Sequence, residues 1–211
     1  MAVFFVYMTR PLIIGVGGFA SDVGKTTLMC ELLRHLPGWE AIKTTRGHYR
    51  SCGKDPHACC VSHLLSDEPV ILSGRKHTYA HAKDTGRYWD AGASNVHWVI
   101  VTDAQVEKGI GQTLELVHSE GVVIEGNSFT QFVDLDYFIM VARGDFKIKS
   151  SARKALGKVS AFYLSDNADP DVFKNRLTKL GYAESIKAPV YTPATLPELI
   201  AEACRSSAVL T

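Results

Sequence analysis

The chain has 211 residues, of which 46% are hydrophobic and 21% charged, a mixture typical of a globular domain and unlike that of a disordered chain. Its net charge of +1 gives no reason to expect nucleic acid or an anionic membrane as a partner, so a basic site must be local. The apolar stretch at residues 2–8 is too short to span a bilayer and predicts an edge strand or a leader. Five cysteines without an export signal favour a reducing, cytoplasmic location over disulfides.

Short apolar runs alternate with helical patterns along most of the sequence. Strands are expected at residues 12–17, 40–43, 70–72, 97–101, 122–124, 137–141 and 159–164, and helices at 28–36, 84–93, 104–118, 171–180 and 196–204. Apolar strands separated by helices indicate a sheet covered on both faces. We therefore expect one α/β domain over residues 1–211, with three layers and a mostly parallel sheet, interrupted by an irregular Cys/His-rich insertion at about 44–83.

The most specific motif follows the first expected strand, where GGFASDVGKTT at residues 17–27 leads into a helix. Glycines let backbone N–H groups close around phosphate oxygens, and the helix N-terminus adds partial positive charge. Lys25 can reach the β- and γ-phosphates of a nucleotide, and the Thr26 hydroxyl can bind Mg²⁺. The expected nucleotide-binding residues are Gly18, Ser21, Asp22, Val23, Gly24, Lys25, Thr26 and Thr27. Five residues separate Gly18 from Gly24 where four are usual, and Phe19 stands where a glycine is common.

This loop, with DVGKT at residues 22–26, resembles that of the dethiobiotin synthetase-like P-loop proteins. Further segments narrow the resemblance: an expected strand ends Ile42-Lys43, KDTGRYWDAGA at residues 83–93 precedes an apolar strand, and EG at residues 125–126 ends another. Together they resemble the molybdopterin-guanine dinucleotide biosynthesis adaptor protein B, a P-loop NTPase. The resemblance covers most of residues 11–170, and its recognisable motifs occupy a fraction of that span.

The resemblance implies a role for several residues. Lys25 and Thr26 would bind phosphate and Mg²⁺, Asp84 and Glu125 would lie near the metal or the attacking water, and Lys43 would face the nucleotide or the substrate. Lys25, Lys43 and Glu125 are the implied catalytic residues. The resemblance also implies GTP or ATP as the nucleotide, a homodimer, and a cofactor-assembly enzyme as a partner.

Some of these residues can be argued from their positions. Glu125 ends an apolar strand, and ligands of open α/β sheets bind at the carboxyl ends of strands; the alternative is a surface loop acid. Asp84 is either a metal-site residue or an acid that favours the start of its helix. Asn167, after the last expected strand, either contacts the nucleotide base or belongs to a turn before Pro170.

The insertion contains a cluster of residues that can bind soft metals. It comprises His48, Cys52, His57, Cys59, Cys60 and His63. Zn²⁺ or Fe at Cys52, Cys59 and Cys60 is one hypothesis, although the spacing matches no standard zinc motif. Solvated histidines and reduced cysteines are the alternative. Arg46, His48, Arg50 and Lys54 lie in the same segment and could bind an acidic small molecule.

Three functions remain open from the sequence. The leading hypothesis is Mg²⁺-dependent binding and slow hydrolysis of GTP or ATP, as in the molybdenum-cofactor guanylylation adaptor. The second is an ATP-dependent ligase or kinase of the dethiobiotin synthetase type, acting on an acidic small molecule. The third is a nucleotide-dependent metallochaperone or partner-binding switch.

Overall fold

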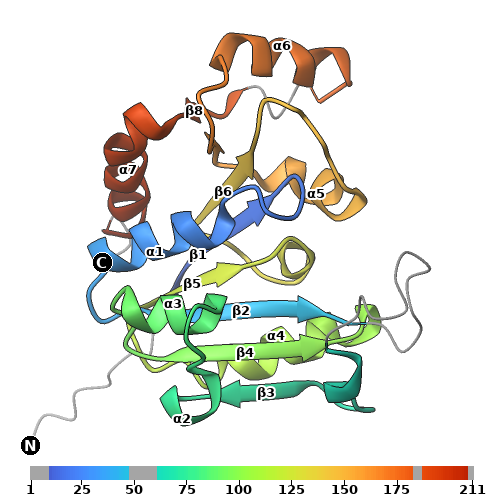
Figure 1. Ribbon diagram of the computed structural model, residues 1–211, viewed down its shortest axis with the longest axis vertical. Helices are drawn as coiled ribbons and strands as arrows, with labels where there is room; N and C mark the ends of the chain where they lie inside the picture. The colour runs from blue at the N-terminus through green and yellow to red at the C-terminus, as the bar shows by residue number, and fades with distance from the viewer. Residues whose placement is uncertain (1–9, 48–60, 183–186, 209–211) are drawn as a thin grey trace, which may run out of the picture.

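The computed structural model describes residues 10–47, 61–182 and 187–208. Its centre is an eight-stranded sheet in the order β3-β4-β2-β5-β1-β6-β7-β8 (Figure 1). The strands are β1 (Leu12–Gly18), β2 (Glu40–Arg46), β3 (Val70–Ser73), β4 (Val96–Val101), β5 (Gly121–Glu125), β6 (Tyr137–Ala142), β7 (Ala161–Leu164) and β8 (Val190–Tyr191). β3 runs antiparallel to β4, and every other neighbouring pair in the sheet is parallel. The expected mostly parallel sheet is confirmed.

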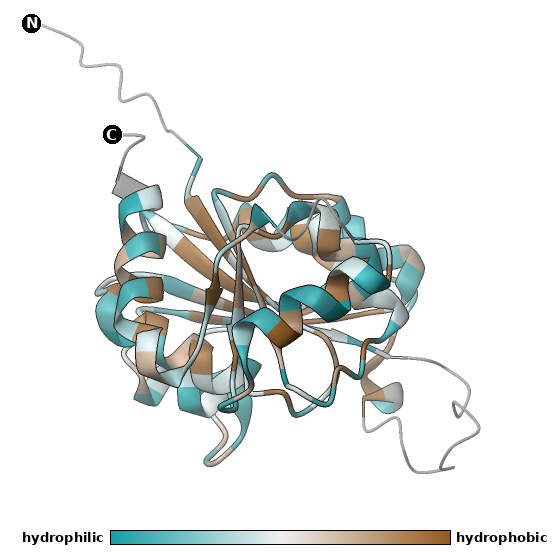
Figure 2. Ribbon diagram, turned by 90° about the horizontal axis from the view of Figure 1, so that it is seen from above, coloured by the Kyte–Doolittle hydropathy of each residue, from teal (hydrophilic) through white to brown (hydrophobic). Residues whose placement is uncertain are grey.

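Helices cover both faces of the sheet. They are α1 (Lys25–His35), α2 (Arg75–Thr78), α3 (Asp84–Asp90), α4 (Val106–Leu114), α5 (Ser150–Ala155), α6 (Pro170–Lys179) and α7 (Leu196–Ala208). One hydrophobic cluster joins the sheet to α1, α3 and α7, and two clusters on the opposite face join it to α4, α5 and α6. Figure 2 shows the hydrophobic strands enclosed between these helices. The fold is the expected three-layer α/β arrangement.

The central strand β1 shows why its sequence is apolar without alternation. Ile14 and Val16 point into the α1 cluster, whereas Ile13 points into the α4 cluster on the other face. Gly15 lies where a Cβ atom would come within 2.7 Å of the Phe138 ring, so the close packing of β1 against β6 needs a glycine here. Burial on both faces is typical of a parallel strand in the middle of a sheet.

Several expected boundaries were wrong. The helix expected at 104–118 is a 3₁₀ turn, Asp103–Gln105, followed by α4, which ends at Leu114. The segment 44–83 is regular in part, because β2 continues to Arg46 and the segment also contains β3 and α2. The elements α2, α5 and β8 were not expected; all three are short, and α2 and α5 lack large apolar side chains. No helix of the described ranges is both long enough and apolar enough to cross a membrane.

Candidate nucleotide site

The loop between β1 and α1 curves so that its backbone faces a cavity. Asp22 and Gly24 have φ angles of 55° and 97°, in the left-handed region, on either side of Val23. Changes of backbone handedness of this kind turn N–H groups to one side and form concave anion sites. A Cβ atom on Gly24 would lie 3.0 Å from Ser165 Cβ, so both the φ angle and the lack of space require glycine.

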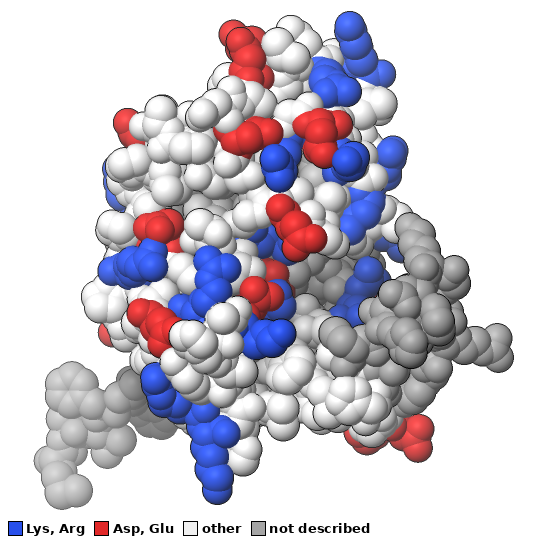
Figure 3. Space-filling model, viewed as in Figure 1, with Lys and Arg blue, Asp and Glu red and all other residues white. Residues whose placement is uncertain are grey.

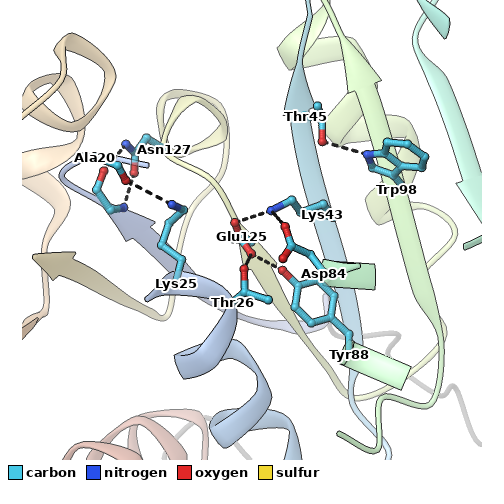
Figure 4. A network of polar contacts seen from close by, with 11 residues as sticks. Ala20, Lys25, Thr26, Lys43, Thr45, Asp84, Tyr88, Trp98, Glu125 and Asn127 are labelled. Atoms are coloured by element: carbon cyan, nitrogen blue, oxygen red, sulfur yellow. Dashed lines mark hydrogen bonds and ion pairs between the residues drawn. The ribbon is translucent and has the colours of Figure 1, made fainter. Parts of the chain in front are cut away.

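Lys25, the first residue of α1, lies across this loop. Its Nζ atom donates to the Ala20 carbonyl oxygen at 3.3 Å (Figure 4). Burial lowers the pKa of Lys25 from its ordinary value, and the attraction of Glu125 opposes that shift in part. The ammonium group is therefore held at the centre of the loop by one weak hydrogen bond, where phosphate oxygens could replace the carbonyl.

The loop forms one wall of a cavity of about 620 Å³. The opposite wall comes from the carboxyl ends of β2 and β5 and from the segment before α5. The lining residues are Ser21, Asp22, Gly24, Lys25, Thr26, Thr27, Lys43, Thr44, Thr45, Arg46, Asp84, Arg87, Glu125, Gly126, Asn127, Ser128, Lys149 and Ser151. Figure 3 shows acidic and basic side chains around a hollow on this face. The cavity thus lies at the carboxyl edge of the sheet, where open α/β sheets bind ligands.

Glu125 is the centre of a polar network on the cavity floor (Figure 4). Its carboxylate accepts from Lys43 Nζ at 2.5 Å, from Thr26 Oγ1 at 3.2 Å and from the Tyr88 hydroxyl. Lys43 Nζ also donates to Asp84 Oδ2 at 2.7 Å. The network therefore joins the start of α1, the strands β2 and β5, and the start of α3.

Charge and burial shift the pKa of three members of this network. Burial lowers the pKa of Lys43, but the attraction and hydrogen bonds of Glu125 and Asp84 outweigh it, so the pKa is raised. Burial raises the pKa of Asp84, but the hydrogen bond and charge of Lys43 prevail, so the pKa is lowered. Burial and the neighbouring Glu125 charge raise the pKa of the Tyr88 hydroxyl well above its ordinary value. At neutral pH, Lys43 is accordingly an ammonium ion and Asp84 a carboxylate.

The oxygens around Thr26 suit a magnesium ion. Mg²⁺ prefers hydroxyl and carboxylate oxygens and is commonly held by one or two protein groups together with substrate phosphates. Thr26, Asp84 and Glu125 supply such oxygens, and Lys43 already places a positive charge between the two carboxylates. Within the described ranges, no cluster of three or more His, Cys, Asp or Glu side chains could hold a metal. Phosphate oxygens would therefore have to complete the coordination.

Asn127 fixes the point where β1 becomes the loop. Its Oδ1 accepts from the Gly18 N–H at 2.8 Å, and its Nδ2 donates to the Gly18 carbonyl at 2.9 Å. β5 pairs with β1 only as far as Glu125 opposite Val16, so the backbone groups of Gly18 on this side have no strand to pair with. The side-chain amide of Asn127 replaces that missing peptide group.

Phe19 anchors the loop from the other side of the sheet. Its fully buried ring packs against Phe146, Phe162 and Phe173, with ring centroids 5.4–6.2 Å apart. The Phe19 N–H also donates to the Val141 carbonyl at 2.9 Å. A residue that departs from the common loop pattern is thus a member of the hydrophobic core.

The structure brings most of the residues singled out in the sequence together. Ser21, Asp22, Gly24, Lys25, Thr26, Thr27, Lys43, Asp84 and Glu125 all line the cavity, while Gly18 and the buried Val23 support the loop from behind. Asn167 is exposed in the turn between β7 and α6 and does not line the cavity. The candidate soft-metal ligands Cys52, Cys59 and Cys60 lie outside the described residues.

The residues missed include the buried Tyr88, which contacts Glu125, and two that line the cavity, Asn127 and Lys149. Tyr88 lies four positions after Asp84, one helical turn away, and this spacing could have pointed to it. Asn127 directly follows Glu125-Gly126. Lys149, which lines the cavity from the segment before α5, had no signal in the sequence because neither that segment nor α5 belongs to a recognisable pattern.

The comparisons with known proteins add little to this geometry. No family model matches the sequence, and no curated protein matches it. A crystal structure of LpxK from Aquifex aeolicus in complex with ATP matches with a TM-score of 0.45 and 18% identity, over 74% of this chain and 48% of that one. A zinc-bound triple mutant of the YjiA GTPase matches with a TM-score of 0.41 and 16% identity, over 87% of this chain and 58% of that one.

The chain spans about half the length of these two structures. The assignment to the three-layer α/β fold of P-loop NTPases rests on the chain itself, in which the loop of residues 18–27 joins a central parallel strand to a covering helix.

Proposed function

We propose that this protein binds a nucleoside triphosphate with Mg²⁺ in the 620 Å³ cavity and transfers its γ-phosphoryl group, slowly to water in the absence of another acceptor. The observation that carries the proposal is the convergence of Lys25, Thr26 and Glu125 beside the curved loop of residues 18–27. A phosphate-binding lysine, a metal-binding hydroxyl and a carboxylate at the end of a neighbouring strand are the parts that phosphoryl transfer requires.

Each residue of the site has a role in this proposal. The backbone N–H groups of the loop and the Lys25 ammonium would bind the β- and γ-phosphates. Thr26, with Glu125 nearby, would hold Mg²⁺, which when bound neutralises developing negative charge on the phosphates. Lys43 keeps the two carboxylates together before the metal arrives.

The proton from the attacking group would go to Asp84. The Glu125 side chain is only 4% exposed and accepts hydrogen bonds from three donors, so it is suited to holding the network in place. The Asp84 side chain is 42% exposed and faces the cavity, which makes it accessible to a water molecule or an acceptor hydroxyl.

The test is a calorimetric titration with non-hydrolysable ATP and GTP analogues, with and without Mg²⁺. We expect binding that depends on Mg²⁺ and is lost in Lys25→Ala. Lys147→Ala is the matched control, because Lys147 is an exposed lysine that pairs with Asp145 and does not line the cavity. Unchanged affinity in Lys25→Ala would refute the assignment of the loop.

The preferred base would separate the two finer functions. A preference for GTP would support a role like that of the molybdenum-cofactor guanylylation adaptor, which acts with a cofactor-assembly enzyme and, by resemblance, as a homodimer. A preference for ATP would support the kinase or ligase. The kinase or ligase is also favoured by Arg46 and Lys149, two cations in the cavity beyond the phosphate loop.

A further inference from the structure

The cavity extends beyond the wall that would bind the phosphates. Beyond Lys43 it extends along Thr44, Thr45 and Arg46 at the end of β2, and along the residues that follow β5. A second cavity of about 210 Å³ adjoins it there and shares three lining residues with it, Arg46, Ser128 and Ser151. The two cavities therefore lie side by side, and together they make up a depression that begins at the phosphate loop and ends beside α5.

The far end of this depression carries an excess of positive charge. Arg46 lies at the junction, Lys149 lines the larger cavity and Lys154 lines the smaller one. Among the described residues that line the smaller cavity, Asp103 is the acid; its side chain is 65% exposed and is bound to Arg46 at 2.6 Å. The smaller cavity is thus lined by two cations, Arg46 and Lys154, and one exposed carboxylate, so an anion would be attracted to this end.

The surroundings of Lys149 also favour an anion at this end. Burial, and then the positive charges of Lys25 and Arg46, lower the pKa of Lys149 from its ordinary value. Crowded cations favour a negatively charged ligand.

We propose that the depression around Arg46, Ser128, Lys149 and Lys154 binds a small anionic acceptor, bearing a phosphate or a carboxylate, to which the γ-phosphoryl group is transferred. This inference rests on the proposed function and names the substrate class of the same site. Guanidinium and ammonium groups with neighbouring hydroxyls are the donors that recognise both anions.

In this transfer one bond to phosphorus forms as another breaks. An oxygen of the acceptor forms a bond to the γ-phosphorus as the bond from that phosphorus to the β–γ bridging oxygen breaks. The bridging oxygen keeps the electron pair and leaves with the nucleoside diphosphate. The proton goes to Asp84 when the attacking group is a hydroxyl, and no proton is transferred when it is a carboxylate. Asp84 and Arg46 line the same cavity, so donor and acceptor would meet within it.

The experiment is calorimetry on the full chain saturated with the Mg²⁺ complex of the non-hydrolysable analogue. Glycerol 2-phosphate is the phosphomonoester probe and glutarate the dicarboxylate probe, each titrated at millimolar concentration. We expect one of them to bind, and Arg46→Met and Lys154→Met each to weaken that binding about tenfold, the loss of one charged hydrogen bond. Nucleotide affinity should stay within about twofold in Lys154→Met, because Lys154 lines the smaller cavity and not the larger one that holds the nucleotide. Lys147→Met is the matched control and should change neither affinity.

The outcomes separate this inference from the proposed function. If the nucleotide analogue binds but neither probe does, or if probe binding ignores both substitutions, the acceptor site is wrong and the nucleotide site stands. If the analogue does not bind, the proposed function fails, and the probes are then titrated into the free protein. Binding that is weakened by Arg46→Met and Lys154→Met but not by Lys25→Ala would still support the anion site, and its absence would overturn it.

Discussion

Replacing Asn127 by alanine tests whether its side chain holds the start of the phosphate loop. The substitution removes both hydrogen bonds to Gly18, at 2.8 and 2.9 Å, and leaves a backbone N–H and a carbonyl unpaired. Each buried group without a partner costs about 1–3 kcal/mol, so the two together cost about 2–6 kcal/mol. The cavity beside Asn127 lets water reach part of the gap, so we expect about 2–4 kcal/mol.

This loss can be measured by urea unfolding or by thermal unfolding. In a chain of this size, each kcal/mol lowers the Tm by roughly 2–4 °C, so Asn127→Ala should melt roughly 4–16 °C below the wild type. Asn167→Ala is the matched control, because Asn167 is exposed and a substitution there should change stability by about 0.5 kcal/mol or less. If Asn127→Ala unfolds within that same margin, the amide does not replace a strand partner.

Three further predictions concern other parts of the fold. Gly86→Ala should destabilise the protein by about 3 kcal/mol or more in thermal unfolding, because its Cβ would lie 2.0 Å from the Ala80 carbonyl oxygen. Gly111→Ala, on an open face of α4, should instead stabilise the protein by about 0.5–1 kcal/mol. The pKa of Glu40 falls to about 2 from 4.5, so its contribution to stability is present above pH 4.5 and is lost as the pH falls toward 2. Glu40→Gln should therefore flatten the pH dependence of urea unfolding in that range, and an unchanged slope would contradict the assignment. Lys43→Met leaves Asp84 and Glu125 without their shared cation, so it should lower the Tm in metal-free buffer, and the Tm should recover when the Mg²⁺ complex of the nucleotide analogue is added; equal losses with and without that complex would count against the metal site.

The shift of Glu40 has a clear structural cause. Burial raises the pKa of Glu40. The hydrogen bond from the buried His97 and those from the backbone N–H groups of His118 and Ser119 lower the pKa by more than burial raises it. His97 Nε2 lies 2.6 Å from Glu40 Oε2, and the two backbone groups donate to Oε1 at 2.8 and 3.0 Å. Glu40 is the first residue of β2 and does not line the cavity, so its titration reports on folding rather than on the nucleotide site.

The fold could be predicted from the sequence wherever burial is complete. β1, β4, β5 and β6 lie inside the sheet with helices on both faces, so their sequences are apolar runs that a pattern detects. The end of β2 was missed because Thr44, Thr45 and Arg46 turn toward the cavity and are polar for that reason. A strand that ends in a binding site loses its hydrophobic signal just where it becomes functional.

The site residues that lie within one short segment could be predicted from the sequence, whereas contacts between distant segments could not. Lys25 and Thr26 belong to a loop whose chemistry is contained in one short segment. The contacts of Tyr88 with Glu125, and of Asn127 with Gly18, join residues 37 and 109 positions apart. Such pairs depend on the strand order, which places β5 between β1 and β2 and which no local pattern determines.

The burial of Phe19 has a consequence for the cost of binding. Phe19 and Val23 are both inside the hydrophobic core, so only Ala20, Ser21 and Asp22 between them can move without opening it. Ordering a backbone residue costs about 1–2 kcal/mol of conformational entropy, and a flexible loop must meet this cost when its ligand arrives. In this protein, most of that entropy cost is already met during folding. The phosphate loop is therefore organised before any nucleotide binds, and ligand affinity is coupled to the integrity of the aromatic cluster on the far side of the sheet.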